Sequence, residues 1–279
     1  MEPYVRILVS SLAIVLINTA GLLLATAQEM EPERLVLVQS GTLPIILTAP
    51  HGCREPIAGI QPRDVKGKPR GGSGYEVGGD RDTDVLVQDI AREIRSLTGQ
   101  DAYLVMVKFQ RKFIDVNRPP KIAFDDPKAE PYYQYYHQTV RHFIDAVRST
   151  HRNGLLIDVH GQGKLPDALV RGTRNGHTIK RLLARAGMPA LTGSSGLFGQ
   201  LEVNGFTVFP TNDVPASGSG ENGGFNGGFT VAQYGSHTAN GIDSIQIEFG
   251  SKYRSKTELQ GTAKRAAKSI VGFYEAYLK

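Results

Sequence analysis

The sequence predicts an α/β fold: a single domain with a mixed, mainly parallel sheet and helices on both faces, which makes three layers. Two observations carry this prediction. Short apolar runs rich in β-branched residues, typical of buried strands, alternate along the chain with amphipathic segments of helical spacing. No repeat and no linker of unusual composition divides the 279 residues, and one large α/β domain accounts for that length.

The expected elements follow from apolar spacing and from breaker residues. A helix begins at Asp82 and Thr83, which cap it, and Gly99 stops it. Pro131 opens a second helix. The Asn204-Gly205 pair suggests a hairpin within residues 198–209. The expected strands are 34–40, 44–48, 102–109, 113–116, 155–160 and 242–249, the expected helices 82–97, 131–153, 178–186 and 257–277, and the expected long loops 62–80 and 216–228.

Composition narrows the class of protein. The apolar fraction of 40% and the charged fraction of 21% are those of an ordinary globular chain. The net charge is +5, but no cluster of five or more Lys and Arg occurs, so we expect no nucleic-acid partner. The mild basic excess indicates dispersed surface charge or attraction of an anionic small molecule.

The N-terminus resembles an export signal. Residues 7–27 are apolar, follow a single Arg6, and end in the small-x-small pattern Ala25-Thr26-Ala27. We expect residues 1–27 to be a cleaved signal peptide, with an uncleaved membrane anchor as the alternative, and residues 30–279 to form the folded domain. The protein is then exported, periplasmic or secreted, and touches a membrane only if the leader is uncleaved. Cys53 is the only cysteine, so no intrachain disulfide supports the fold.

Two histidines follow apolar strands and are each followed by glycine. His51 closes the run that begins at Leu43, and His160 closes the run that begins at Leu155. Open α/β sheets bind ligands at the carboxyl ends of their strands. With Glu55 four residues after His51, the set of two histidines and one glutamate matches a catalytic zinc site, which has three protein ligands and a water. Asp158 points to the same side of its strand as His160 and could orient an imidazole.

A further carboxylate and two arginines complete the candidate site. Glu248 lies near the end of an apolar strand, where it could accept a proton from the attacking water and pass it to a leaving amine. Asn117 and Arg118 are suited to clamp a substrate carboxylate. Either Arg111 or Arg118 could instead stabilise the oxyanion of a tetrahedral intermediate.

These motifs together resemble the N-formylglutamate amidohydrolase family, which is similar in architecture to the zinc carboxypeptidases. The resemblance covers roughly residues 44–250. It is carried, in order, by Ala49-Pro-His51-Gly52, Asp80-Arg-Asp82-Thr83-Asp84, Ile114-Asp115-Val-Asn117-Arg118-Pro-Pro, Tyr132-x-x-x-Tyr136-His137, Leu-Ile-Asp158-Val-His160-Gly, Gly-Gly-Phe229-Thr and Ile-Gln246-Ile-Glu248.

The resemblance implies a phosphorylase/hydrolase-like fold, one zinc, and hydrolysis of an amide next to a free carboxylate. It makes His51 and His160 metal ligands, Asn117-Arg118 the carboxylate clamp and Glu248 the general base. This chain departs from the pattern of the family in two respects. The leader suggests export, and the spacing from His51 to Glu55 differs from the His-x-x-Glu of carboxypeptidases.

We therefore expect a zinc amidohydrolase that acts on an N-acyl amino acid, N-formylglutamate-like, or on a related carboxylate-bearing small or peptide-like substrate. One alternative is an exported carboxypeptidase-like, poly-γ-glutamate or cell-wall peptidase with a groove formed by loops 62–80 and 216–228. Another is a non-catalytic binding module whose metal is structural and closed by four protein ligands.

Overall fold

A computed structural model describes residues 31–279 except 73, 214–219 and 222–223. The predicted leader, residues 1–27, and part of the predicted loop 216–228 lie outside the described residues. Within the described part of the chain, a seven-stranded sheet has the order β1-β3-β2-β4-β7-β5-β6. The strands are β1 Val36–Gln39, β2 Ile45–Ala49, β3 Tyr103–Val107, β4 Leu155–Gln162, β5 Ala168–Gly172, β6 Thr207–Phe209 and β7 Asp243–Gly250.

The sheet is mixed and mainly parallel, as the sequence predicts. Strands β3, β2, β4 and β7 run parallel in a central block, and β6 is parallel to β5. The β1–β3 and β7–β5 pairs are antiparallel. The carboxyl ends of β2, β4 and β7 therefore meet at one edge of the sheet.

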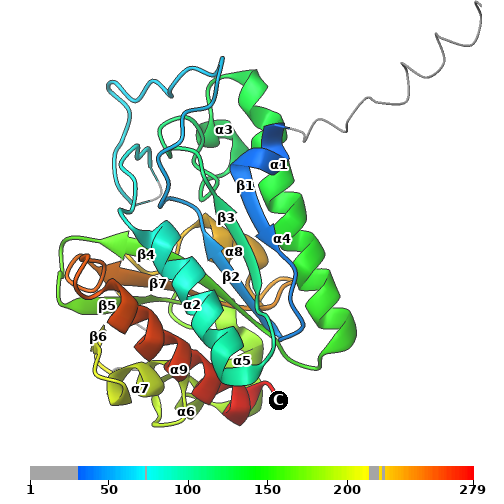
Figure 1. The fold of residues 1–279 in the computed structure, drawn as a ribbon, viewed down its shortest axis with the longest axis vertical. Coiled ribbons are helices and arrows are strands. Elements are labelled where there is room, and N and C mark those ends of the chain that lie inside the picture. Colours follow the sequence, from blue (N-terminus) through cyan, green and yellow to red (C-terminus); the bar gives the residue numbers. More distant parts are fainter. Residues whose placement is uncertain (1–30, 73, 214–219, 222–223) are drawn as a thin grey trace, which may run out of the picture.

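Helices cover both faces and give the predicted three layers (Figure 1). One core cluster packs α2, α5, α6, α7 and α9 on one face, and a second packs α1 and α4 on the other. Neighbours Ile45 and Ile46 of β2 point into different clusters, which explains why this strand is buried on both faces and mainly apolar. The helices are α1 Glu31–Leu35, α2 Thr83–Thr98, α3 Pro120–Ala123, α4 Glu130–Thr150, α5 Lys180–Ala186, α6 Pro189–Thr192, α7 Leu197–Val203, α8 Phe229–Tyr234 and α9 Leu259–Tyr277, with short 3₁₀ segments at Pro127–Ala129 and His177–Ile179.

Two predicted elements are wrong. Residues 113–116 form turns, because the amide of Phe113 donates to Gln110 and the amide of Asp115 donates to Ala123, not to a neighbouring strand. The predicted hairpin at 198–209 is the helix α7 followed by β6. Phe198 and Leu201 are both fully buried and lie three residues apart, which is the spacing of one helix face. The apolar residues of this segment also alternate loosely, and that alternation suggested strands instead.

The start of α2 also differs from the prediction in a way that bears on the site. Asp82 precedes the helix with φ 63° and makes no side-chain cap. Instead, the hydroxyl of Thr83 donates to the carbonyl of Asp80 over 2.8 Å. This bond fixes the backbone of Asp80 where the long loop enters the helix.

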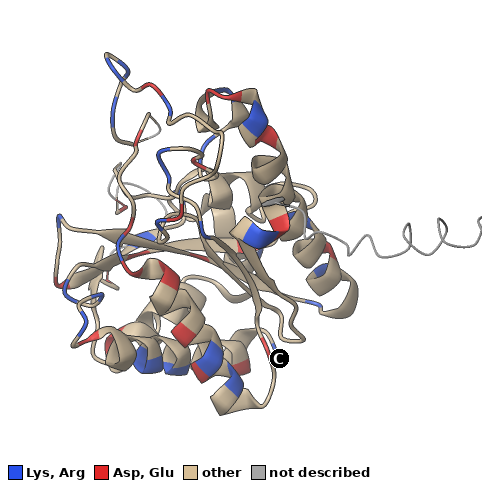
Figure 2. Cartoon of the chain, turned by 45° about the horizontal axis from the view of Figure 1, so that its top comes forward, with Lys and Arg blue, Asp and Glu red and all other residues tan. Residues whose placement is uncertain are grey.

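Among residues 31–279 that the structure describes, we find no helix with the length and apolarity needed to cross a bilayer. Lys and Arg are interspersed with Asp and Glu along the helices and loops (Figure 2).

Candidate metal centre and catalytic cleft

The two predicted histidines meet at the carboxyl edge of the sheet. His51 follows β2 and His160 lies in β4, and their ring centroids are 4.9 Å apart. Both are almost fully buried. The glycine after each has a packing reason: a Cβ on Gly52 would lie 2.3 Å from the amide of Asp84, and one on Gly161 would lie 2.5 Å from the guanidinium of Arg254.

Asp80 is the carboxylate that joins the histidines. Its Oδ2 atom lies 2.9 Å from Nδ1 of His160 and 3.4 Å from Nδ1 of His51. One ligand atom from each of the three residues lies within 4.8 Å of the others, and in the described part of the chain they form the group suited to hold a metal ion. Nδ1 of His51 is buried and has no hydrogen-bond partner among the described residues, which is the state of an imidazole nitrogen reserved for a metal.

The outer nitrogens of both imidazoles contact buried carboxylates. Nε2 of His51 lies 2.8 Å from Oδ1 of Asp115, and Nε2 of His160 lies 2.9 Å from Oδ2 of Asp158. The Thr48 hydroxyl donates to the other oxygen of Asp158 over 2.6 Å. Each carboxylate can accept the proton of Nε2, so Nδ1, which faces Asp80, is the nitrogen of each imidazole that would bind a metal. This carboxylate–histidine pairing is the usual support of a metal ligand, and the predicted role of Asp158 matches its position.

The electrostatics of the site favour a cation. Burial alone would raise the pKa of Asp80, but the nearby His51 and His160 hold it well below its usual range. Burial would likewise raise the pKa of Asp115, and Arg111 and His51 overcome it and hold it far below the usual value. Burial would lower the pKa of His160, whereas Asp158 and Asp80 raise it well above the ordinary value. Asp80 and Asp115 therefore stay ionised, and their negative charge favours a cation at the site.

Glu55, the predicted third ligand, does not reach the histidines. Its carboxylate is 47% exposed and pairs with Arg34 over 3.3 Å. The backbone explains this position, because Glu55 forms an isolated bridge with Phe109 beyond the end of β3 and is drawn away from His51. In the structure, Asp80 takes the place that the sequence prediction gave to Glu55.

Glu248 lies beside His160, as the prediction requires. The two are register partners on the parallel strands β4 and β7, so their side chains share one face. Gln246 donates to Oε1 of Glu248 over 2.9 Å and accepts from the amide of Gly228 over 2.7 Å. Burial raises the pKa of Glu248 to about 7, with Asp80 adding to the rise and His160 and Arg111 opposing it.

Arg111 also lies in the cleft. Its Nε donates to Oδ2 of Asp115 over 2.7 Å, and its Nη1 contacts the carbonyl of Gly78 at 3.4 Å. Burial would lower the pKa of Arg111, but Asp115 and Asp80 raise it, so its charge is firmly held. Because Asp115 touches both Arg111 and His51, one buried carboxylate sets the positions of a cation and of a candidate ligand.

Asn117 and Arg118 line the cleft, but their polar atoms contact the protein itself. Oδ1 of Asn117 accepts from the amide and hydroxyl of Thr230, and its Nδ2 lies 3.2 Å from Nε2 of His160. Arg118 donates to the carbonyls of Gly72, Gly74 and its own neighbour Asn117. The geometry gives both residues a positioning role: Asn117 holds the start of α8 against His160, and Arg118 holds the loop that leads to Asp80.

Sequence reasoning missed three residues of this site. Asp80 and Asp115 stand in the motifs quoted above, but Asp80 ends a glycine-rich segment without an apolar period, and Asp115 lies in the wrongly predicted strand 113–116, where sequence reasoning assigned it no role. Arg254 lies far along the chain and donates to the carbonyls of Phe249, Gln162 and Arg81. It thereby ties together the neighbours of Glu248, His160 and Asp80.

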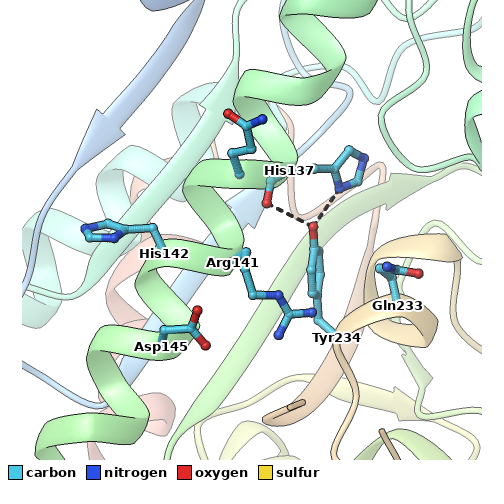
Figure 3. A pocket seen from close by; sticks show the side chains of 7 residues that line it. His137, Arg141, His142, Asp145, Gln233 and Tyr234 are labelled. Atoms are coloured by element: carbon cyan, nitrogen blue, oxygen red, sulfur yellow. Dashed lines mark hydrogen bonds between the residues drawn. The ribbon is translucent and has the colours of Figure 1, made fainter. Parts of the chain in front are cut away.

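The candidate site opens into a cleft of about 770 Å³. A separate, more open pocket of about 420 Å³ lies between α4 and α8 (Figure 3). There, Nδ1 of His137 and the hydroxyl of Tyr234 are 2.7 Å apart, and the same hydroxyl donates to the backbone carbonyl of His137. His137 is thus a partly buried residue that packs against α8, while His142 points away from this contact (Figure 3).

Comparison with known proteins agrees with this fold. A family model described as N-formylglutamate amidohydrolase matches residues 126–253, which include His160 and Glu248. No curated protein sequence matches the chain. The solved N-formylglutamate amidohydrolase from Ralstonia eutropha JMP134 superposes with a TM-score of 0.57 at 16% identity, over 87% of this chain and 97% of that one.

A gene product from Agrobacterium tumefaciens gives a TM-score of 0.56 at 15% identity, over 88% of this chain and 94% of that one. At these identities the structural likeness speaks for the fold. Together with the family model, it confirms the resemblance of this chain to the N-formylglutamate amidohydrolase family.

Proposed function

We propose that the protein is a zinc-dependent amidohydrolase that cleaves the amide bond of an N-acyl amino acid with a free carboxylate, N-formylglutamate-like. The observation that carries this proposal is the convergence of Nδ1 of His51, Nδ1 of His160 and Oδ2 of Asp80 beside Glu248. The family match supports amide hydrolysis.

The residues present fit zinc. Two imidazole nitrogens and one carboxylate oxygen are ligands that zinc prefers, and three protein ligands leave a position open for chemistry. The orphaned Nδ1 of His51 and the carboxylates behind both imidazoles support the same assignment. When bound there, zinc would polarise the scissile carbonyl and lower the pKa of a coordinated water.

Glu248 acts as the general base and then as the general acid. Its pKa near 7 allows it to take a proton from the attacking water and to return that proton to the leaving amine. Gln246 fixes one carboxylate oxygen of Glu248, so the other is directed at the reacting groups.

Arg111 stabilises the oxyanion that forms when water adds to the carbonyl. Asp115 anchors Arg111 from behind, so the guanidinium is oriented before the reaction begins. A preorganised donor in a site shielded from water stabilises developing charge far more than a mobile surface arginine does.

The test is hydrolysis of N-formyl-L-glutamate by purified protein before chelation, after chelation and after zinc is restored. We expect activity to disappear with the metal and to return with zinc, and the melting temperature to fall and recover in parallel. Unchanged activity after the metal has been shown by elemental analysis to be absent would overturn the proposal. A fourth protein ligand, seen by X-ray absorption, would favour the binding module with a structural metal instead.

A peptidase is the second candidate, and the size of the cleft favours it. A volume of about 770 Å³, bordered by residues 71–72, 76, 78–79 and 224–229, exceeds what a formylated amino acid needs. A panel of N-formylglutamate, γ-glutamyl oligomers and cell-wall peptides separates the candidates. Turnover that increases with substrate length supports the peptidase, and inactivity on every long substrate excludes it.

We also propose that the protein is exported, on the evidence of the apolar segment 7–27 and its small-x-small end. N-terminal sequencing of the protein from cell fractions tests this. A mature N-terminus shortly after Ala27 in the exported fraction supports a cleaved signal, whereas an intact N-terminus in the membrane fraction supports an anchor.

A further inference from the structure

Arg174 is a cation at the cleft wall, and none of the residues that the structure describes pairs with its charge. Its side chain lines the same cleft as His51 and Glu248. Among the described residues its guanidinium forms no ion pair and no side-chain hydrogen bond, unlike Arg111 and Arg118 in the same cleft. An arginine left free in a cleft that also holds buried carboxylates is available to an anionic ligand.

The backbone at Arg174 is held in an uncommon conformation. Arg174 has φ 50° and Asn175 has φ 55°, left-handed values that non-glycine residues rarely adopt, and Gly176 follows with φ 86°. Backbone of this kind persists only where the surroundings fix it, and it concentrates at ligand-binding positions. The turn directs Arg174 from the end of β5 into the cleft.

Glu221 is the residue that fixes this turn. Its buried carboxylate accepts from the amides of Thr173 and Asn175, over 2.8 and 2.9 Å, and from Nε of the buried Arg171 over 3.3 Å. The amide of Arg174 itself donates to the carbonyl of Asn226. The backbone on both sides of Arg174 is therefore fixed by hydrogen bonds, while its guanidinium bonds to no side chain in the described part of the chain.

A short path connects Arg174 to the catalytic carboxylate. Gly227 lies against Arg174, because a Cβ at Gly227 would be 3.1 Å from Cγ of Arg174. The next amide, that of Gly228, donates to Gln246, which in turn donates to Glu248. Lys164 adds a second cation to the same cleft, with its Nζ 5.4 Å from the ring of Phe225.

We propose that Arg174 binds the side-chain carboxylate of the substrate and so selects for acidic side chains, with Lys164 as an auxiliary charge and Glu221 as the positioning residue. This rests on the proposed amidohydrolase function and moves the clamp away from Asn117-Arg118, whose donors contact the protein itself. Lys164 is a flexible point charge, so discrimination depends mainly on the planar guanidinium.

The test compares N-formyl-L-glutamate with N-formyl-L-glutamine in the zinc-loaded wild type, Arg174→Gln, Arg174→Lys and the exposed distant control Arg152→Gln. We expect Arg174→Gln to raise KM for the glutamate substrate by roughly 10- to 100-fold, the effect of losing a charge-assisted hydrogen bond. Its KM for the glutamine substrate and its kcat should stay within about threefold. Arg174→Lys should recover part of the loss, and Arg152→Gln should match wild type.

Glu221→Gln tests positioning, and it should raise KM for the glutamate substrate alone while Arg174 keeps its charge. A variant Arg174→Gln that keeps the preference for glutamate, or that loses both substrates equally, overturns the inference. If wild type hydrolyses neither compound, the proposed function fails separately. Calorimetric titration of wild type and Arg174→Gln with glutamate and glutamine then tests the carboxylate site independently of catalysis. Equal affinity of the two proteins for glutamate would refute the role of Arg174.

Discussion

Nδ1 of His160 lies 2.9 Å from Oδ2 of Asp80, a residue 80 positions earlier in the chain. The contact exists because β4 ends where the long loop enters α2, and Thr83 and Arg254 fix that junction. It replaces the predicted pairing with Glu55 and defines which carboxylate would share a metal with the histidines.

Glu248→Gln should abolish most turnover while metal and fold are retained. The amide cannot accept the proton of the attacking water, so we expect kcat to fall roughly 10²- to 10⁴-fold. Zinc content and circular dichroism should match wild type, and the exposed Glu275→Gln serves as the control. Near-normal kcat in Glu248→Gln would remove this residue from the mechanism.

Arg118→Gln should loosen the loop that precedes Asp80. Its guanidinium donates to the carbonyls of Gly72 and Gly74 over 2.7 Å each, and these bonds are lost. Limited proteolysis should therefore cleave within residues 62–80 faster than in wild type, and kcat should fall for charged and neutral substrates alike. An unchanged digestion pattern with a loss confined to acidic substrates would instead restore Arg118 as the carboxylate clamp.

Much of the fold follows from the sequence because burial leaves a periodic trace. The strands that carry or lead to His51, His160 and Glu248 are buried almost throughout and mainly apolar, since helices cover both faces of the sheet, and the apolar runs reveal them in the sequence alone. The register that sets His160 beside Glu248 depends on that same burial.

The errors arise where contact in space is independent of distance along the chain. Glu55 is near His51 in sequence, but its backbone bridge to Phe109 places its side chain away from His51. Asp80 and Asp115 lie in loops, and their roles depend on hydrogen bonds to residues far away in the sequence. The same holds for Arg118, whose residue type suggests a clamp, although its guanidinium donates to the backbone carbonyls of Gly72, Gly74 and Asn117.

Stability should fall with acidification through His137. Burial lowers its pKa from 6.5 to about 4, so between these values the unfolded chain binds a proton that the folded chain does not. The free energy of unfolding should therefore decrease by about 2 kcal/mol from this residue between pH 7 and pH 5. Urea unfolding of wild type and His137→Phe at both pH values measures the difference, with the exposed His142→Phe as control. Equal pH dependence in wild type and His137→Phe would contradict this assignment.

Glu221→Ala should destabilise the fold more than a surface substitution does. Glu221 is the carboxylate partner of Arg171, a residue with no exposed surface, and breaking a buried pair from one side typically costs about 3–5 kcal/mol. Thermal and urea unfolding of Glu221→Ala, Glu221→Gln and the exposed Glu275→Ala give the comparison. A midpoint for Glu221→Ala as high as that for Glu275→Ala would show that the pair contributes little.

The metal centre itself is tested most directly by the zinc content of purified wild type, Asp80→Ala and Glu55→Ala. Three ligands drawn from His51, Asp80 and His160 predict about one zinc per chain in wild type and in Glu55→Ala, and a large loss in Asp80→Ala. Zinc retained in Asp80→Ala but lost in Glu55→Ala, or zinc absent from wild type grown with an adequate supply, would contradict the account.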